Sequence, residues 1–305
     1  MPDKIMLVYS KGYAVDIGDH VFPTSKYRSI KDQLLKDPAI KERAEFVAPG
    51  KARDEDLLLA HDKPYIDKLL SGTLSREEIM RTELPYSEQL VEAALICCQG
   101  TILATQIALQ DSLGIHIGGG FHHAFPDHGE GFCILNDIAV AVKRLIKYGP
   151  TKKAIIVDCD LNHGNGTAAI FAGDRDVFTF SIHQENNYPF LRPASSCDIG
   201  LEDGAGDKEY LDALEKSMPA IMKKFKPDFL MYVAGADPYK EDQLGALKLT
   251  KEGLKKRDEF VYNQAKDASI PVAVVLAGGY AFRESDIVDI HCNTIKSGIE
   301  IFKGA

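Results

Sequence analysis

Short apolar runs alternate along the chain with amphipathic segments. The apolar runs lie at residues 5–10, 114–119, 154–160, 177–183, 229–235 and 271–279. Between them, apolar residues recur at three- and four-residue intervals, as they do in helices, in the segments 87–110, 136–148 and 207–225. Runs that are apolar at successive positions predict strands buried on both faces. We therefore expect the α/β class, with a central parallel sheet covered by helices on both faces.

This alternation continues through most of the chain. No repeat, low-complexity tract or linker divides it, so we expect residues 1–305 to form a single domain. Charged residues and prolines obscure the pattern between about residues 11 and 86, where the elements are least defined.

The composition is that of an ordinary soluble protein. The hydrophobic fraction is 45% and the charged fraction 27%, and we expect no apolar run long enough to cross a bilayer. The first residues, MPDKIMLVYSKGY, lack the basic and apolar regions of a signal peptide, which favours a cytoplasmic location. The net charge of −9 opposes attraction to nucleic acid or to anionic membranes, so we expect neither as a partner.

Polar residues follow several of the predicted strands. In open parallel sheets, ligand sites lie beyond the carboxyl ends of the strands, so we expect these side chains to gather at one edge of the sheet. They are His122 and His123 after the run 114–119, Asp158, Asp160 and Asn162 around the end of the run 154–160, Asp237 after the run 229–235, and Tyr280 after the run 271–279.

Asp160 and Asp237 come from separate strand ends and could share one divalent cation. Side chains alternate along an extended chain, so Asn162 projects to the same side as Asp160 and could add an amide oxygen, whereas His163 projects to the other side. The alternative is that each aspartate caps a helix or orders a turn. Clustered acids without a cation would repel one another, which weakens that alternative.

His122 and His123 follow a glycine-rich stretch and suit acid–base catalysis. One imidazole of such a pair can accept a proton from water while the other donates a proton to a leaving amine. Tyr280 could lend its hydroxyl to a developing oxyanion. The alternatives are an ordinary pair of surface histidines and a core tyrosine.

Several motifs follow one another in a fixed order. They are GGGFHHAFPDHGEGFCILND (118–137), VDCDLNHGNGTAAIF (157–171), FTFSIH (178–183), AGADP (234–238) and LAGGY (276–280). This set resembles the histone deacetylase family of zinc-dependent deacylases from about residue 20 to the C-terminus. The short chain and the GNG tripeptide make it most similar to the class IV branch and its bacterial relatives. The resemblance implies the arginase/deacetylase-like fold, with about eight parallel strands flanked by helices.

The resemblance also implies a role for each strand-end residue. Asp160 and Asp237 would bind one Zn²⁺ per chain, together with the residue at position 162. His122 and His123 would form the catalytic pair, and Tyr280 would polarise the scissile carbonyl.

Further residues are implied around this centre. Asp158 would orient His122, and Asn165 takes the place, often held by an aspartate, that supports His123. Gly120 and Phe121 would line the acyl-lysine tunnel. A structural K⁺ or Na⁺ would be held by Asp158, Asp160 and Ser181.

Asn162 departs from the family pattern, because the family has a histidine zinc ligand at this position. An amide oxygen is a poorer zinc ligand than an imidazole, and His163 points to the other face of an extended segment. Three interpretations remain open. Asn162 is a deliberate substitution, a natural variant in which Asn162 or water completes the coordination of a harder metal, or the mark of a relative that binds acyl-lysine without cleaving it.

These features predict a zinc-dependent amidohydrolase weakened by Asn162. Its substrate would be an acylated lysine in a peptide or protein, or a small acylated amine. A catalytically silent acyl-lysine-binding relative is the alternative. A ureohydrolase of the same fold is less favoured, because AGADPYKED lacks the Asp-x-Asp pattern that a second metal would need.

Overall fold

An eight-stranded sheet forms the centre of the molecule, as seen in a computed structural model that describes residues 4–304. The strand order is β2-β1-β3-β8-β7-β4-β5-β6, and every neighbouring pair is parallel. The predicted parallel α/β sheet is therefore confirmed. The strands are β1 (Ile5–Val8), β2 (Ala44–Val47), β3 (Leu113–His116), β4 (Ala154–Asp158), β5 (Val177–Gln184), β6 (Cys197–Leu201), β7 (Phe229–Val233) and β8 (Val272–Val275).

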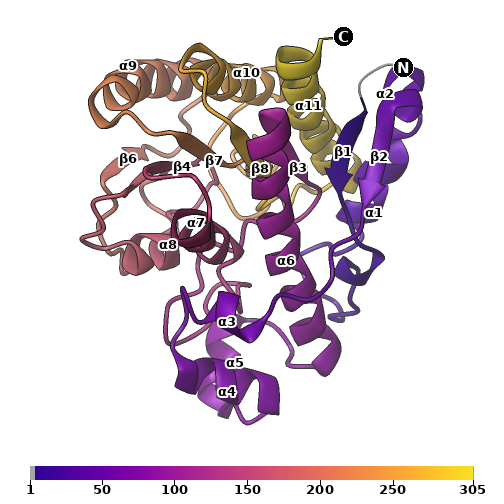
Figure 1. Cartoon of the computed structure of the whole chain (residues 1–305), viewed down its shortest axis with the longest axis vertical. Helices are drawn as coiled ribbons and strands as arrows, with labels where there is room; N and C mark the ends of the chain where they lie inside the picture. The colour runs from indigo at the N-terminus through magenta and orange to yellow at the C-terminus, as the bar shows by residue number, and fades with distance from the viewer. Residues whose placement is uncertain (1–3, 305) are drawn as a thin grey trace.

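Helices connect the strands and cover both faces of the sheet (Figure 1). The predicted segments 87–110, 136–148 and 207–225 are all helical. The α-helices are α1 (Lys26–Leu34), α2 (Pro38–Arg43), α3 (Asp54–Leu57), α4 (Lys63–Ser71), α5 (Arg76–Thr82), α6 (Glu88–Asp111), α7 (Asp137–Tyr148), α8 (Asn165–Ile170), α9 (Asp207–Phe225), α10 (Lys251–Asp267) and α11 (Glu284–Lys303), and Lys11–Tyr13 forms a short 3-10 helix.

Alternate residues of the central strands enter two different cores. On β7, Leu230 and Tyr232 pack with apolar residues of α1, α9, α10 and α11. Phe229, Met231 and Val233 of the same strand pack with residues of α6 and α7 on the opposite face. Both faces of the sheet are therefore buried, which explains why the central strands are apolar at successive positions.

Helix α6 is long and apolar enough to cross a membrane by length and composition. The expectation that no apolar run reaches this length was therefore wrong. In the structure, 56% of the apolar 18-residue window of α6 is buried inside the fold. The helix lies across β3 and β8 (Figure 1), and its packing against the sheet accounts for its apolar character.

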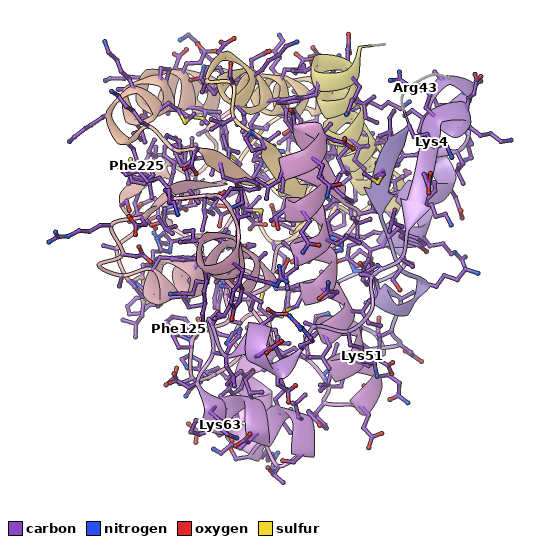
Figure 2. All side chains as sticks on the ribbon, viewed as in Figure 1. Lys4, Arg43, Lys51, Lys63, Phe125 and Phe225 are labelled. Carbon is purple, nitrogen blue, oxygen red and sulfur yellow. The ribbon has the colours of Figure 1, made fainter. Side chains whose placement is uncertain are left out.

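The edge strands β2 and β6 lie outside the predicted runs. Their residues are only partly buried, because each edge strand has a neighbour on one side alone. An edge strand has less apolar surface to cover and so gives a weaker sequence signal. Long charged side chains such as Lys4, Lys51 and Lys63 extend from the surface (Figure 2).

β3 ends before the glycine-rich stretch that follows it. Gly119 and Gly120 have φ angles of 72° and 96°, which favour glycine. A side-chain carbon on Gly120 would collide with the backbone of Ala277. Ala277 lies two residues beyond the end of β8. The chain therefore turns sharply here and brings the next residues over the edge of the sheet.

Candidate active site

The strand-end residues predicted from sequence meet at one edge of the sheet. β3, β8, β7 and β4 are consecutive neighbours in its centre, and their carboxyl ends point the same way because the strands are parallel. A cavity of about 210 Å³ opens above these ends. Its lining includes the predicted residues Gly120, Phe121, His122, His123, Asp160, Asn162 and Tyr280.

Two carboxylates lie side by side beneath this cavity. A side-chain carbon on Gly235 would lie 2.5 Å from Asp237 Oδ1 and 2.7 Å from Asp160 Oδ2. A side-chain carbon on Gly278 would collide with Asp237 Oδ2 and would lie 2.7 Å from Asp160 Oδ2. The two glycines thus leave the space in which both carboxylates fit.

Burial and the neighbouring charge of Asp160 raise the pKa of Asp237 well above its usual value. Asp237 Oδ1 accepts a hydrogen bond from the backbone N–H of Leu161 at 3.0 Å, but Oδ2 is buried without a hydrogen-bond partner. An unpartnered oxygen beside a second buried carboxylate is the arrangement that a cation stabilises. The pair therefore fits a divalent cation.

The third donor at this position is an amide. Within residues 4–304, no three His, Cys, Asp or Glu side chains form a metal-ligand group. Asn162 lines the cavity, and its Nδ2 donates to the backbone carbonyl of Tyr188 at 3.0 Å. This bond leaves Asn162 Oδ1 as the atom that can serve as a ligand. The donors available to a metal are thus two carboxylates and one amide oxygen, which suits hard divalent cations better than zinc.

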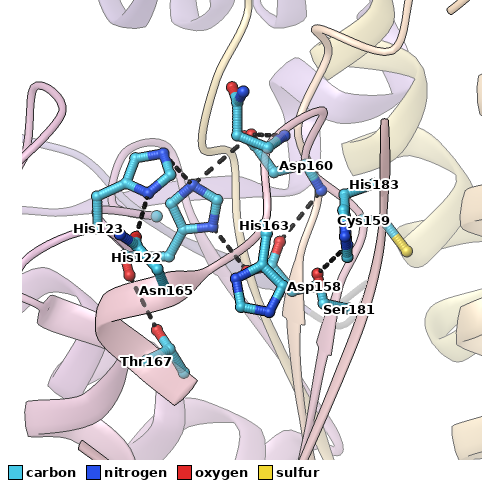
Figure 3. A network of polar contacts seen from close by, with 12 residues as sticks. His122, His123, Asp158, Cys159, Asp160, His163, Asn165, Thr167, Ser181 and His183 are labelled. Carbon is cyan, nitrogen blue, oxygen red and sulfur yellow. Dashed lines mark hydrogen bonds and ion pairs between the residues drawn. The ribbon is translucent and has the colours of Figure 1, made fainter. Parts of the chain in front are cut away.

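His163 points away from the cavity, as the alternation of side chains predicts. Its Nε2 lies 3.0 Å from Asp198 Oδ1, and its ring packs edge-on against His183 at 4.9 Å between centroids. His183 Nδ1 in turn lies 2.9 Å from Ser181 Oγ, and Ser181 pairs with Asp158 in the register of β4 and β5 (Figure 3). His163 cannot replace the missing imidazole, and the monovalent-cation site of Asp158, Asp160 and Ser181 stays a prediction.

His122 lies between two carboxylates. Its Nδ1 donates to Asp158 Oδ2 at 2.7 Å, and its Nε2 lies 3.6 Å from Asp160 Oδ1 (Figure 3). Burial disfavours the imidazolium, but the charges of Asp158 and Asp160 outweigh burial and raise the pKa of His122 to about 9. His122 is therefore cationic at neutral pH.

His123 has the opposite character. Burial, together with the charge of His122, lowers the pKa of His123 to about 3. Its Nε2 lies 3.1 Å from His122 Nε2, and its Nδ1 lies 2.7 Å from Asn165 Oδ1 (Figure 3). Since the carbonyl oxygen of Asn165 only accepts, the proton of neutral His123 lies on Nδ1 and its Nε2 carries a lone pair.

Tyr280 forms part of the cavity wall. Its backbone N–H donates to Asp242 Oδ2 at 2.7 Å, which fixes the turn after β8. Its ring contacts Phe22 and Phe132, with centroids 6.3 Å and 5.9 Å away. Burial raises the pKa of Tyr280 well above 10, so its hydroxyl keeps the proton that it can donate.

Most of the chain matches a known catalytic domain. Residues 20–294 match the family model of the histone deacetylase domain. The chain belongs to the histone deacetylase family. An uncharacterised protein of Picosynechococcus sp. is 38% identical over 286 residues, covering 93% of this chain and 95% of that protein. Histone deacetylase 2 of Arabidopsis thaliana is 30% identical over 290 residues, covering 91% of this chain and 75% of that protein.

The fold is also that of a solved member of the family. The crystal structure of the HDA15 HD domain matches with a TM-score of 0.78 and covers 98% of this chain and 94% of that one. At 22% sequence identity, this likeness concerns the fold alone. It confirms the arginase/deacetylase-like architecture, and membership of the histone deacetylase family supports a deacylase function in general.

Several residues around this cavity were missed at the level of sequence. Glu130, Gly131 and Phe132 lie inside the motif 118–137, yet no role was predicted for them. Gly131, Phe132 and Tyr188 line the cavity, and the ring of Tyr188 meets His123 edge-on at 4.9 Å. Tyr188 follows β5 on an irregular loop, where hydrophobic periodicity carries no information about contacts.

Lys26 is a further residue that the sequence did not reveal. It is fully buried on α1, and its Nζ donates to the backbone carbonyl of Ala277 at 2.7 Å. The ammonium lies 5.1 Å from the ring centre of Phe22 and 5.8 Å from that of Tyr280. Burial lowers the pKa of Lys26 to about 8, although the charge of Asp237 opposes this shift. Lys26 thus places positive charge close to the acidic pair.

Asp137 holds the turn that carries the histidine pair. It is fully buried at the start of α7 and accepts the backbone N–H groups of Gly120 and Phe121, the latter at 2.8 Å. The hydroxyl of Thr101 donates to its other oxygen at 2.5 Å. The two backbone N–H groups of the turn thus depend on one carboxylate.

Replacing Asp137 with alanine should therefore destabilise the deacetylase domain. Each buried donor left without a partner costs roughly 1–3 kcal/mol, so we expect the free energy of unfolding to fall by at least about 2 kcal/mol. Urea unfolding measures this loss. The matched control is Glu215→Ala, an exposed position on α9, which should change stability by less than about 0.5 kcal/mol. Equal stability of the two variants would contradict the role given to Asp137.

Proposed function

We propose that the protein is a metal-dependent amidohydrolase that removes acyl groups from acylated lysine or from a small acylated amine. Its activity is lowered by Asn162 at the position of a metal ligand. One observation carries the proposal. A histidine pair, a tyrosine and Asp160 from different strand ends line a single cavity, and Asp237 lies beside Asp160. That combination supplies each group that amide hydrolysis needs.

Asp160, Asp237 and the amide oxygen of Asn162 would hold the metal. A divalent cation held by these residues would supply Lewis-acid chemistry toward the acyl oxygen and the attacking water. Zinc is the cofactor predicted from the family, and the all-oxygen donor set of this chain favours a harder cation. The identity of the metal is therefore part of the proposal.

The two histidines have different roles in the reaction. The unprotonated Nε2 of His123 accepts the proton of the attacking water, because this atom carries the lone pair. The cationic His122, held by Asp158, stabilises the negative charge that develops on the substrate. The proton on His123 then passes to the departing amine.

Tyr280 acts on the acyl oxygen. Its hydroxyl stays protonated and lies in the wall of the same cavity, so it can donate a hydrogen bond as that oxygen becomes negative. Gly120 and Phe121 line the cavity and would contact the acyl group. The net negative charge of the chain favours a substrate with cationic flanks.

Three further expectations from the sequence accompany this proposal. They are a single catalytic domain over residues 1–305, a cytoplasmic location, and the absence of nucleic-acid and membrane partners. Each stays a prediction.

A catalytically silent binder of acyl-lysine is the second candidate. The amide of Asn162 favours it, since the site lacks a third His, Cys, Asp or Glu ligand among residues 4–304. Such a binder would use the cavity and its aromatic wall without hydrolysis.

Metal analysis and a deacylation assay on the same preparation separate the two candidates. The purified chain is dialysed against Zn²⁺, Mn²⁺ or Mg²⁺ in turn, then assayed on an acetyl-lysine peptide and on a small N-acetylated amine. We expect a bound divalent cation and slow hydrolysis that a chelator abolishes. Binding of the peptide with neither metal nor hydrolysis would contradict the enzyme and favour the binder.

A further inference from the structure

Glu130 lies in a rigid turn beside the cavity. Its backbone N–H donates to the carbonyl of Cys133, and the N–H of Cys133 donates back, both at 2.9 Å. The following residues are tied to the end of α5, since the N–H of Phe132 donates to the carbonyl of Thr82 at 2.8 Å. Backbone hydrogen bonds therefore fix the position of the main chain that carries the Glu130 side chain.

The carboxylate of Glu130 receives donors from separate parts of the chain. Its Oε1 accepts from Asn165 Nδ2 at 2.6 Å and from the hydroxyl of Tyr188 at 2.8 Å. Its Oε2 lies 3.4 Å from Nε2 of His128. Burial alone would raise the pKa of Glu130, but these hydrogen bonds outweigh it and lower the pKa to about 2. Glu130 is therefore an ionised carboxylate that can only accept hydrogen bonds.

This restriction decides which way the amide of Asn165 faces. A carboxylate beside it requires the NH₂ end, so the carbonyl end faces Nδ1 of His123. If the amide were reversed, its NH₂ group would face His123 and would require a lone pair on Nδ1. The proton of His123 would then move to Nε2, where it would face Nε2 of His122 at 3.1 Å. His122 would have to lose its own Nε2 proton, and Nε2 of His123 would no longer accept a proton.

We propose that Glu130 is a positioning residue for His123, because it fixes the orientation of the Asn165 amide and thereby the tautomer of the imidazole. The catalytic consequence rests on the proposed function, whereas the tautomer itself does not. Tyr188 shares the carboxylate and packs edge-on against the same imidazole. Glu130 thus joins the support of His123 to the aromatic wall of the cavity.

Nitrogen NMR of histidine tests the tautomer without any need for activity. The ¹⁵N shifts and long-range ¹H–¹⁵N couplings of His123 distinguish protonated Nδ1 from protonated Nε2. We expect protonated Nδ1 in the native chain at pH 7.5. In Glu130→Leu, which offers no acceptor, and in Glu130→Gln, which can face Asn165 with either end of its amide, we expect a mixture of both tautomers. An unchanged His123 pattern in the folded variants would overturn the proposal.

His61 provides an internal control in every sample. Its Nδ1 lies 2.9 Å from the carbonyl of Phe125, and its Nε2 accepts from the N–H of Asn136 at 3.0 Å, so its tautomer is fixed independently of Glu130. A native His61 pattern shows that a variant is folded. If one of the two variants fails to fold, the other decides.

Further variants distinguish the effect of the Glu130 carboxylate from the effects of neighbouring residues. Glu83→Gln removes a carboxylate from an exposed residue of the same cavity rim and should leave His123 unchanged. Tyr188→Phe removes a donor to Glu130 but leaves the bond to Asn165, so the native tautomer should persist. The double variant Glu130→Leu/Asn165→Asp should restore protonated Nδ1, because both ends of a carboxylate accept. A tautomer mixture that persists in this double variant would contradict the amide reversal.

Catalysis provides a second readout in the Asn162→His background. There, Glu130→Leu should lower kcat by about 10- to 100-fold with a smaller change in KM, as for other residues that act by orienting a catalytic group. Adding Asn165→Asp should recover most of that loss. If every variant is inactive while the tautomer changes as expected, the proposed function fails and the role of Glu130 stands.

Discussion

Replacing Asn162 with histidine should raise the affinity of the site for Zn²⁺ by at least about 10- to 100-fold and increase deacylation accordingly. The imidazole would join the carboxylates of Asp160 and Asp237, completing three protein ligands with one position left open. The backbone carbonyl of Tyr188, which now accepts from Asn162, could accept the other ring N–H of the new histidine. That bond would orient the imidazole and favour a lone pair toward the metal.

Isothermal titration with Zn²⁺ and Mn²⁺ measures the change in affinity directly. We expect the preference to move toward zinc in Asn162→His, because imidazole is a softer ligand than an amide oxygen. Asn162→Ala is the matched control and should bind both cations no better than the native chain. Zinc affinity that is equal in the native chain and in Asn162→His would show that position 162 is not a ligand.

Removing the hydroxyl of Tyr280 should lower kcat by about 100- to 1000-fold in the Asn162→His background. The hydroxyl would donate to the acyl oxygen only as that atom gains negative charge, so KM should change little. Metal affinity should not change, because Tyr280 is not among the proposed ligands. The measurement is a comparison of kcat and KM for Tyr280→Phe with the parent, together with the zinc titration.

Tyr262→Phe provides the control for this substitution. Tyr262 lies on α10, and its buried hydroxyl has no hydrogen-bond partner. Its removal deletes the same atom from a comparable interior position outside the cavity. A similar loss of kcat in both variants would assign the effect to packing and would contradict the role of Tyr280.

Much of the sheet could be predicted from sequence because its central strands are buried on both faces. β4 and β7 show this clearly, since all their residues are buried and apolar except Asp158 and the hydroxyl of Tyr232. The edge strands β2 and β6 are partly exposed and gave no such run. The apolar length of α6 also had to be interpreted from its packing, because a buried helix and a membrane helix share that composition.

Some residues of the candidate site could likewise be predicted from sequence, and others could not. Asp160, Asp237 and Tyr280 follow the ends of β4, β7 and β8 within a few residues, so the position of the strand end predicts where each side chain gathers. Glu130 and Tyr188 lie on irregular loops, and their contact depends on how two loops approach each other. Sequence spacing carries no information about that approach, and so the support of His123 was only partly foreseen, through Asn165.

The placement of the site on four neighbouring strands has an evolutionary consequence. Each strand is fixed by backbone hydrogen bonds that do not depend on the side chains in the loops. A substitution in a loop therefore leaves the strands themselves in place, even where side chains link neighbouring loops. The strand order keeps His122, Asp237 and Tyr280 at one edge of the sheet although position 162 is asparagine. Substitutions in the loops thus alter the chemistry of the site without altering the scaffold that carries it.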